Sequence, residues 1–215
     1  MNKNSQARCI AHEIRNQISI CELYSQIINK HMEKSGIKND SISNALKCIS
    51  KSLKIMGNNL LDLKSLDNVD FKTLDACSLV KDAVNLSVVY VQEKDINISL
   101  SCRSNALIYV DENKFLSCIV NIIKNAIEAI EEKGEIEINI DKSDDNLLIK
   151  ISNNGSKIPD DVQKHLFDEG FTTKKNGSGL GLPICAENLK LQNANLKLVE
   201  STDEKTEFEI EIPAN

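Results

Sequence analysis

The 215-residue chain contains no tryptophan, only three prolines and only 4% aromatic residues. Without large rings, its core must be built from Ile, Leu, Val and Ala, as helices packed on a mixed sheet can be. Hydrophobic residues make up 41% of the chain, and no segment has the composition of a disordered protein. The length allows one ordinary domain and a helical extension.

The chain also lacks a basic field and a long apolar run. Its net charge is −6, and Lys and Glu are scattered rather than gathered in blocks, so nucleic acid is not an expected partner. No stretch approaches the roughly 18 to 20 apolar residues of a membrane span, and the first residues contain no secretory core. The sequence therefore predicts a cytoplasmic protein with no membrane span.

The seven cysteines form an odd set with no Cys-x-x-Cys pair and no His at metal spacing. We interpret them as small buried hydrophobic residues in a reducing compartment, although a redox-sensing cysteine stays an alternative. They are Cys9, Cys21, Cys48, Cys77, Cys102, Cys118 and Cys185.

Residues 1–68 have a helical pattern. Apolar residues recur at alternating spacings of four and three from Ile42 through Leu46, Ile49 and Leu53 to Leu63, which is a coiled-coil seam. A similar, wider stripe precedes a break at 35–40, where Asp40 or Ser41 is available as a helix cap. One hairpin cannot bury this surface, so we predict a homodimer in which two hairpins form a four-helix bundle.

Residues 69–215 have a mixed pattern, which predicts a two-layer α/β sandwich and makes the whole chain α+β. We expect helices at 76–92, from Asp111 as cap to about 132, and from about 181 onward. We expect strands at 96–102, 106–110, 135–141, 147–152, 196–200 and 206–212, with a flexible segment at 159–178.

Asn121 and Asn125 lie four residues apart on one predicted helix, so their side chains share a face. Amide oxygens can ligate Mg²⁺ that also contacts phosphate, although a solvated polar stripe would have the same spacing. Farther on, Gly177, Gly179 and Gly181 alternate directly before a helix, where backbone amides can bind phosphate. A flexible turn is the alternative.

With His12, these segments resemble the two-component histidine kinases, and the second part resembles the ATPases of the gyrase, heat-shock chaperone and mismatch-repair superfamily. The resemblance covers essentially the whole chain. It rests on the order and spacing of HEIRNQ at 12–17, NIIKNAIEA at 121–129, ISNNG at 151–155, LFDEGFTTK at 166–174 and GSGLGL at 177–182.

The resemblance implies that His12 accepts the phosphoryl group, that Glu13 orients or deprotonates its imidazole, and that Asn16 lies one turn away. Residues 1–68 would be the dimerisation and phosphotransfer hairpin, and residues 69–215 the catalytic domain that binds ATP and Mg²⁺. Asn125 would be the metal ligand. The implied nucleotide-binding residues are Asn121, Lys124, Asn125, Asn153, Gly155, Phe171, Thr172, Thr173, Lys174, Gly177, Ser178, Gly179, Leu180, Gly181 and Leu182.

The sequence departs from the family at three positions. Asn153 stands where the family usually has an Asp that accepts a hydrogen bond from the adenine amino group, so ATP binding is predicted to be weaker by about tenfold. Lys157 replaces a Gly and limits backbone freedom. In the family a Pro often follows the HExxN segment, and Gln17 stands at that position. The first helix is therefore predicted to be straighter.

Two functions from different classes remain at this point. The first is an ATP-dependent autokinase that phosphorylates His12 and passes the phosphoryl group to an aspartate on the receiver domain of a response regulator. The second is a relay or scaffold whose nucleotide site has decayed, motivated by Asn153 and Lys157. Because few residues precede His12, we expect any signal to come from a separate sensory protein, a cysteine or a ligand.

Overall fold

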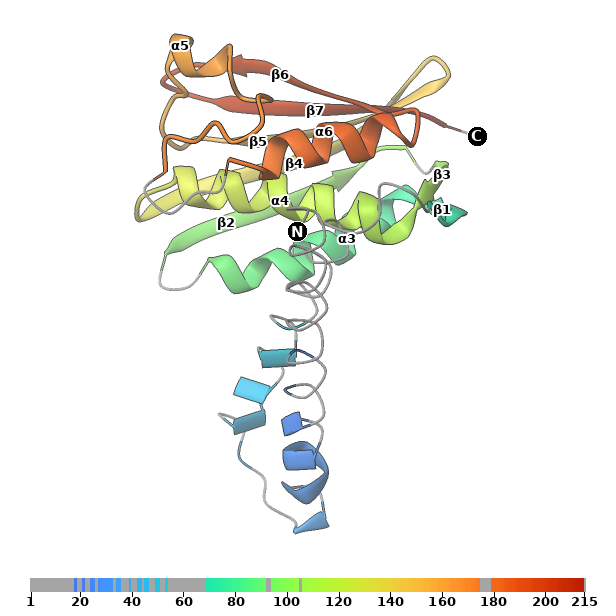
Figure 1. Cartoon of the computed structure of the whole chain (residues 1–215), viewed down its shortest axis with the longest axis vertical. Helices are drawn as coiled ribbons and strands as arrows, with labels where there is room; N and C mark the ends of the chain where they lie inside the picture. Colours follow the sequence, from blue (N-terminus) through green and yellow to red (C-terminus); the bar gives the residue numbers. More distant parts are fainter. Residues whose placement is uncertain are drawn as a thin grey trace, which may run out of the picture. The chain divides into compact units, whose positions relative to one another are not determined.

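The computed structural model describes two parts of the chain (Figure 1). It describes residues 18, 21, 24, 25, 27–32, 34, 35, 39, 42, 43, 45, 46, 49, 50, 53, 69–91, 94–104, 106–174 and 179–214. The chain divides into two compact units, Met1–Asn68 and Val69–Asn215. Each unit is described by itself below.

In the first unit, the described residues from Ile18 to Lys34 and from Ile42 to Leu53 are helical. Asn39 caps the second segment, because its side-chain oxygen accepts a hydrogen bond from the amide of Ile42 at 3.2 Å. Asp40 and Ser41, the residues predicted to provide this cap, lie outside the described residues. The amide of Ile42 is three residues after Asn39, which is the spacing that a capping side chain reaches.

The predicted seam divides into buried and exposed positions in the single chain. Leu46 and Leu53 are buried, and Leu53 clusters with Ile18 of the first segment. Ile42 and Ile49 are 42% and 46% exposed, although they belong to the same seam. Half of the described seam is therefore covered by the chain itself, and half is left at the surface.

The second unit alternates strands and helices. Its elements in order are β1 (Phe71–Asp75), α3 (Ala76–Ser87), a 3-10 turn (Val88–Tyr90), β2 (Asp95–Cys102), β3 (Leu107–Asp111), α4 (Glu112–Ala129), β4 (Lys133–Ser143), β5 (Asn146–Asn153), α5 (Asp160–Gln163), α6 (Gly181–Lys190), β6 (Asn195–Ser201) and β7 (Thr206–Pro213). The predicted strands and helices match these within a few residues, except that β1 and the short α5 were not predicted. Helix α4 also ends at Ala129 instead of near Glu132, because Ile130 is already extended.

Five strands form one mixed sheet in the order β2-β4-β5-β7-β6, in which only β2 and β4 run parallel. Strands β1 and β3 form a separate antiparallel pair, so the strand predicted at 106–110 does not join the main sheet. Helices α3, α4 and α6 form a second layer on one face of the sheet (Figure 1). This is the predicted two-layer arrangement.

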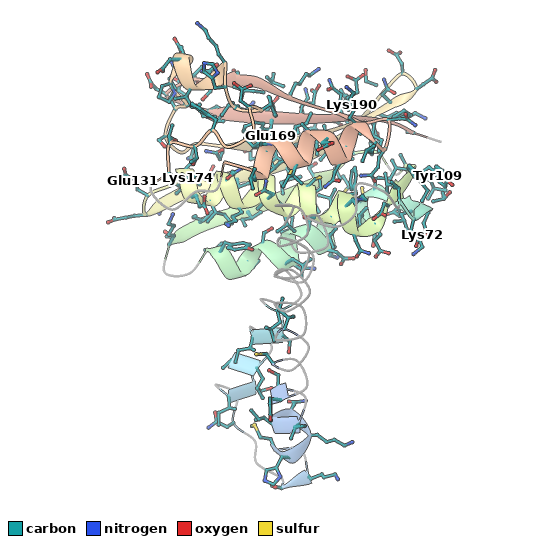
Figure 2. The ribbon with its side chains drawn as sticks, in the orientation of Figure 1. Lys72, Tyr109, Glu131, Glu169, Lys174 and Lys190 are labelled. Atoms are coloured by element: carbon teal, nitrogen blue, oxygen red, sulfur yellow. The ribbon has the colours of Figure 1, made fainter. Side chains whose placement is uncertain are left out.

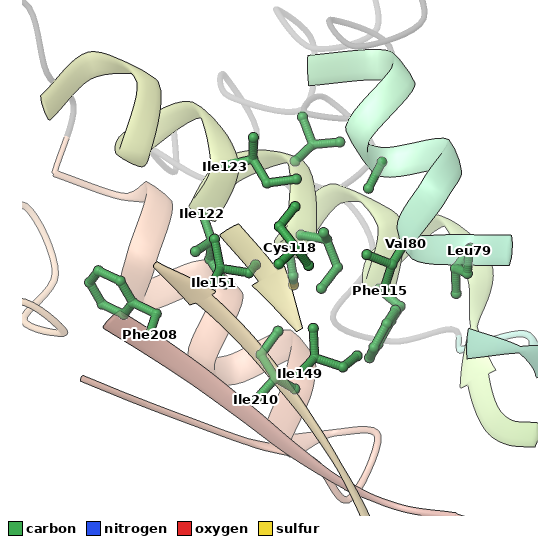
Figure 3. Close-up of a cluster of buried hydrophobic side chains, with 14 of the residues drawn as sticks. Leu79, Val80, Phe115, Cys118, Ile122, Ile123, Ile149, Ile151, Phe208 and Ile210 are labelled. Carbon is green, nitrogen blue, oxygen red and sulfur yellow. The ribbon is translucent and has the colours of Figure 1, made fainter. Parts of the chain in front are cut away.

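The core lies between these layers and consists mostly of aliphatic side chains, together with Phe115 and Phe208 (Figure 3). Ile149 and Ile151 on β5 and Ile210 on β7 alternate with residues of the opposite face, as the period of a strand requires. Ile122 and Ile123 cover them from α4. Helix α4 is therefore fixed on the sheet along its length.

Asp111 caps the start of α4, as the sequence predicts. The Asp111 carboxylate accepts hydrogen bonds from the amides of Lys114 at 3.0 Å and Asp70 at 2.8 Å, and the Asp111 amide donates to the side chain of Gln192 at 2.8 Å. One residue thus starts α4 and joins it to the segment after α6. This fixes the direction in which the Asn121 and Asn125 face of α4 points.

Candidate functional site

One face of helix α4 gathers the segments that the sequence analysis singled out. The α4 face comprises Asn121, Asn125, Glu128 and Ala129, which lie four, three and one residues apart and so project to one side. Three distant segments contact it: the glycine-rich start of α6, the segment before it that carries Lys174, and the turn after β5. The site is built around this helix.

The start of α6 packs directly on Asn121. A Cβ atom at Gly181 would lie 2.7 Å from Asn121 Nδ2 and 3.0 Å from its Oδ1, so a larger residue there would displace the Asn121 amide. The same amide group donates a hydrogen bond to Cys185 Sγ at 3.2 Å. Asn121 is therefore held between the first and second turns of α6.

Lys174 brings a positive charge to the next turn of α4. Lys174 is labelled in Figure 2. Its ammonium group donates a hydrogen bond to Asn125 Oδ1 at 2.9 Å and forms an ion pair with Glu128. An amide oxygen and a carboxylate here share one cation. Asn125 Oδ1, which the resemblance assigns to Mg²⁺, thus has the position and chemistry to hold a cation, and the lysine ammonium occupies that position here.

Lys124 flanks the same carboxylate from the other side. Its ammonium lies 3.8 Å from Glu128 and 5.2 Å from the centre of the Tyr90 ring. Burial raises the pKa of the Tyr90 hydroxyl, and the Glu128 carboxylate raises it further. Tyr90 is therefore neutral at physiological pH, and Glu128 is held by lysines on both sides.

The turn after β5 closes the far end of the α4 face. The amide of Ser156 donates to the carbonyl of Ala129 at 2.9 Å. A Cβ at Gly155 would meet that carbonyl at 2.5 Å, which explains the glycine. Asn153, the last residue of β5, is 5% exposed, and its buried side-chain nitrogen Nδ2 has no hydrogen-bond partner in the described part of the chain.

The backbone at Lys157 accommodates a lysine without strain. Its backbone is not among the positive-φ residues of the described chain, so a glycine is not required there. Its ammonium forms an exposed ion pair with Asp160 at 3.0 Å. This geometry gives no support to a weakening of the site by Lys157.

Contacts within the chain join the start and the end of the segment between α5 and α6. The amide of Gly170 donates to the carbonyl of Gly179 at 3.0 Å, and the Phe171 ring packs against His165, which pairs with Asp168. The Thr172 hydroxyl accepts a hydrogen bond from the Lys174 amide at 3.1 Å. The other predicted residues of this region are neighbours of these in the sequence. Thr173 precedes Lys174, and Leu180 and Leu182 lie at the start of α6.

We expect Gly179→Ala to open this segment. Gly179 has φ +67°, and an added Cβ would lie 2.3 Å from the Gly170 backbone, whereas Gly170, with φ +78°, has open space around it. Both alanines carry the left-handed backbone cost of about 1 kcal/mol, but only the first also collides with the backbone. Hydrogen exchange of the residue-170 amide should quicken at least tenfold more in Gly179→Ala than in Gly170→Ala; equal rates would contradict the packing.

Five predicted site residues lie outside the described residues. They are His12, Glu13, Asn16, Gly177 and Ser178. Sequence reasoning in turn missed Glu128, Ala129 and Cys185, which contact the predicted residues. Glu128 could have been found from its spacing, since it is three residues after Asn125 and faces the same side.

Comparison with known proteins agrees with this arrangement. Residues 110–215 match the family described as histidine kinase-, DNA gyrase B- and HSP90-like ATPase. Sporulation kinase B of Bacillus subtilis is 26% identical over 97% of this chain and 49% of its own length, and sporulation kinase C of the same organism is 29% identical over 95% and 47%. The chain spans about half the length of these two relatives.

Solved structures share the fold. Full-length ShkA in complex with AMPPNP superposes with a TM-score of 0.68 at 17% identity, over 99% of this chain and 46% of that one. The catalytic domain of histidine kinase ThkA superposes with a TM-score of 0.61 at 24% identity, over 67% of this chain and 95% of that one.

Among the residues described here, no helix is long and apolar enough to cross a membrane.

These findings confirm the α+β ATPase domain and the resemblance that the motifs predicted. Residues 110–215 carry a domain of the histidine kinase-, DNA gyrase B- and HSP90-like ATPase family, and the chain is similar in sequence to the sporulation kinases along nearly its whole length.

Proposed function

We propose that this protein is an ATP-dependent histidine autokinase that phosphorylates His12 and transfers the phosphoryl group to an aspartate on the receiver domain of a response regulator. Residues 1–68 are the dimerisation and phosphotransfer hairpin, and residues 69–215 the catalytic domain. The observation that carries the proposal is the convergence of the α6 start, Lys174 and the β5 turn on the α4 face.

The residues of the α4 face fit a magnesium nucleotide. Asn125 Oδ1 would share Mg²⁺ with phosphate oxygens, and the ion would neutralise charge on the transferred group. Asn121 and the backbone amides at Gly177, Gly179 and Gly181 would contact phosphate, with Lys124 and Lys174 supplying positive charge. Phe171, Thr172 and Thr173 would close over the site and exclude water.

His12 has the chemistry of the acceptor. A neutral imidazole nitrogen attacks phosphorus, and His is the side chain for which this form is abundant near pH 7. Glu13 would orient the ring or take its proton, and Asn16 would contact the phosphoryl group from the next turn. The phosphoryl group then leaves His12 for a receiver aspartate.

The half-exposed seam of the first unit supports the homodimer. Ile42 and Ile49 lie at the surface of the single chain, on the stripe whose other described members, Leu46 and Leu53, are buried. Burying an isoleucine contributes about 1.5–3 kcal/mol. A second copy of the hairpin supplies a partner of the same pattern.

We expect Ile42→Asp with Ile49→Asp to weaken dimerisation at least about a hundredfold, since each dimer loses four buried isoleucines. Sedimentation equilibrium measures this directly. Val199→Asp is the matched control, because Val199 on β6 is equally exposed at 47% but lies outside the seam. An unchanged association constant in the double variant would exclude the proposed bundle interface.

The function is tested by incubating the protein with γ-labelled ATP and Mg²⁺ and then adding a receiver domain. The proposal predicts acid-labile, base-stable label on the chain that moves to the receiver aspartate. The alternative, a relay or scaffold with a decayed nucleotide site, predicts no label from ATP but charging of His12 by a phosphorylated regulator. This alternative is kept because Asn153 replaces the Asp that usually binds adenine in the family.

A further inference from the structure

The side chain of Asn153 has a buried hydrogen-bond donor that the folded chain does not use. The residue is 5% exposed, and Nδ2 has no hydrogen-bond partner among the residues that the structure describes. Such an atom is costly unless a ligand or water satisfies it. Because Asn153 ends β5 beside the turn that contacts the α4 face, a nucleotide bound there can supply the partner.

The polar groups near Asn153 already form hydrogen bonds with each other. Thr206, which pairs with Asn153 across β5 and β7, shares a hydrogen bond of 2.7 Å with the Ser201 hydroxyl. Ser201 also accepts a hydrogen bond from the Ile158 amide at 2.9 Å. On the other side, a Cβ at Gly155 would lie 2.9 Å from Asn153 Nδ2, so the backbone confines the amide closely.

A carboxamide and a carboxylate select different purine edges. An ionised Asp can only accept, so it suits the amino group at C6 of adenine and repels an oxygen at that position. Asn carries a donor and an acceptor, which exchange places on a half-turn of the side chain. It can therefore accept from the adenine amino group, or donate to the O6 of a 6-oxopurine while accepting from N1–H.

We propose that the nucleotide site accepts 6-oxopurine nucleotides as well as adenine nucleotides, and that Asn153 is the residue that determines this specificity. The inference rests on the proposed function, because it takes Asn153 to contact the base. It adds a second substrate class, the inosine and guanosine nucleotides, to that site.

The test compares ADP with inosine diphosphate, because the two bases differ only at the edge that Asn153 would contact and neither nucleotide has a γ-phosphate to transfer. Calorimetric titration of the full chain with Mg²⁺ should give dissociation constants within about tenfold of each other. In Asn153→Asp, ADP should bind about tenfold tighter and inosine diphosphate about tenfold weaker, so that their ratio rises roughly a hundredfold.

Asn154→Asp is the matched control, since it adds the same charge one residue away. Asn154 is exposed, and its Oδ1 accepts a hydrogen bond from the Glu135 amide at 2.8 Å, which a carboxylate oxygen can also accept. The nucleotide ratio should stay at its wild-type value in this variant. An equal rise in both variants would contradict a specific role of Asn153.

The outcomes separate this inference from the function beneath it. Wild-type protein that binds ADP but discriminates against inosine diphosphate by more than a hundredfold overturns the inference and leaves the kinase proposal intact. An unchanged ratio in Asn153→Asp overturns it as well. A chain that binds neither nucleotide overturns the proposed function itself.

Discussion

Replacing His12 with Gln is expected to abolish phosphorylation of the chain while nucleotide affinity stays within about twofold of the wild type. Gln has no ring nitrogen that can attack phosphorus, so the acceptor is lost completely. The proposed nucleotide site is built around the α4 face from described residues of the second unit, whereas residue 12 belongs to the first unit. The measurement is label transferred from γ-labelled ATP, with calorimetry for affinity.

His31→Gln is the matched control for this change. His31 is exposed and helical in the same unit as His12. Its replacement should leave labelling at the wild-type level. Persistent acid-labile label in His12→Gln would place the acceptor at another histidine, whereas loss of nucleotide binding in that variant would contradict the division into acceptor and nucleotide-binding parts.

Removing the side chain of Asn125 is expected to eliminate the contribution of Mg²⁺ to nucleotide binding. Asn125 Oδ1 is the atom to which the Lys174 ammonium donates in this structure, so it is placed to meet a cation. In Asn125→Ala, the ATP affinity measured with Mg²⁺ should fall to the affinity measured in EDTA. Titration of each protein under both conditions checks this.

Asn125→Asp keeps an oxygen at the same position and should retain the dependence on Mg²⁺. Asn146→Ala controls for the loss of an Asn amide elsewhere, because Asn146 lies at the start of β5 and bonds to Glu211 at 2.8 Å. If Asn125→Ala binds ATP with full magnesium dependence, the metal is held by other residues.

Much of the catalytic domain could be predicted because its elements have strong local signals. Asp111 is a capping residue before a long amphipathic pattern, and the helix begins there. Strands β4 and β5 alternate apolar and polar residues, and both form. The pattern of β1 is weak, since this short strand is only partly buried and its pairing with β3 is set by the fold.

The candidate site was predicted in its residue types but not in its contacts. The spacing of Asn121 and Asn125 placed both on one helix face, whereas their partners come from segments distant in sequence. Lys174 reaches Asn125 across 49 positions, and Cys185 reaches Asn121 across 64. Such long-range contacts depend on how α6 and the preceding segment pack on α4, and local periodicity carries no information about that packing.

The prediction for Lys157 shows the reverse case. A family glycine replaced by lysine suggests strain, but strain depends on the backbone angle, which sequence does not give. In the structure this backbone needs no glycine, and the lysine pairs with Asp160.

The measurement that tests the central claim most directly is a calorimetric titration of the unmodified chain with an ATP analogue that cannot transfer its γ-phosphoryl group, in Mg²⁺ and in EDTA. We expect saturable binding of one nucleotide per chain, tighter in Mg²⁺ than in EDTA. That result would establish a working nucleotide site despite Asn153. The absence of saturable binding under both conditions would contradict the autokinase and leave a relay or scaffold.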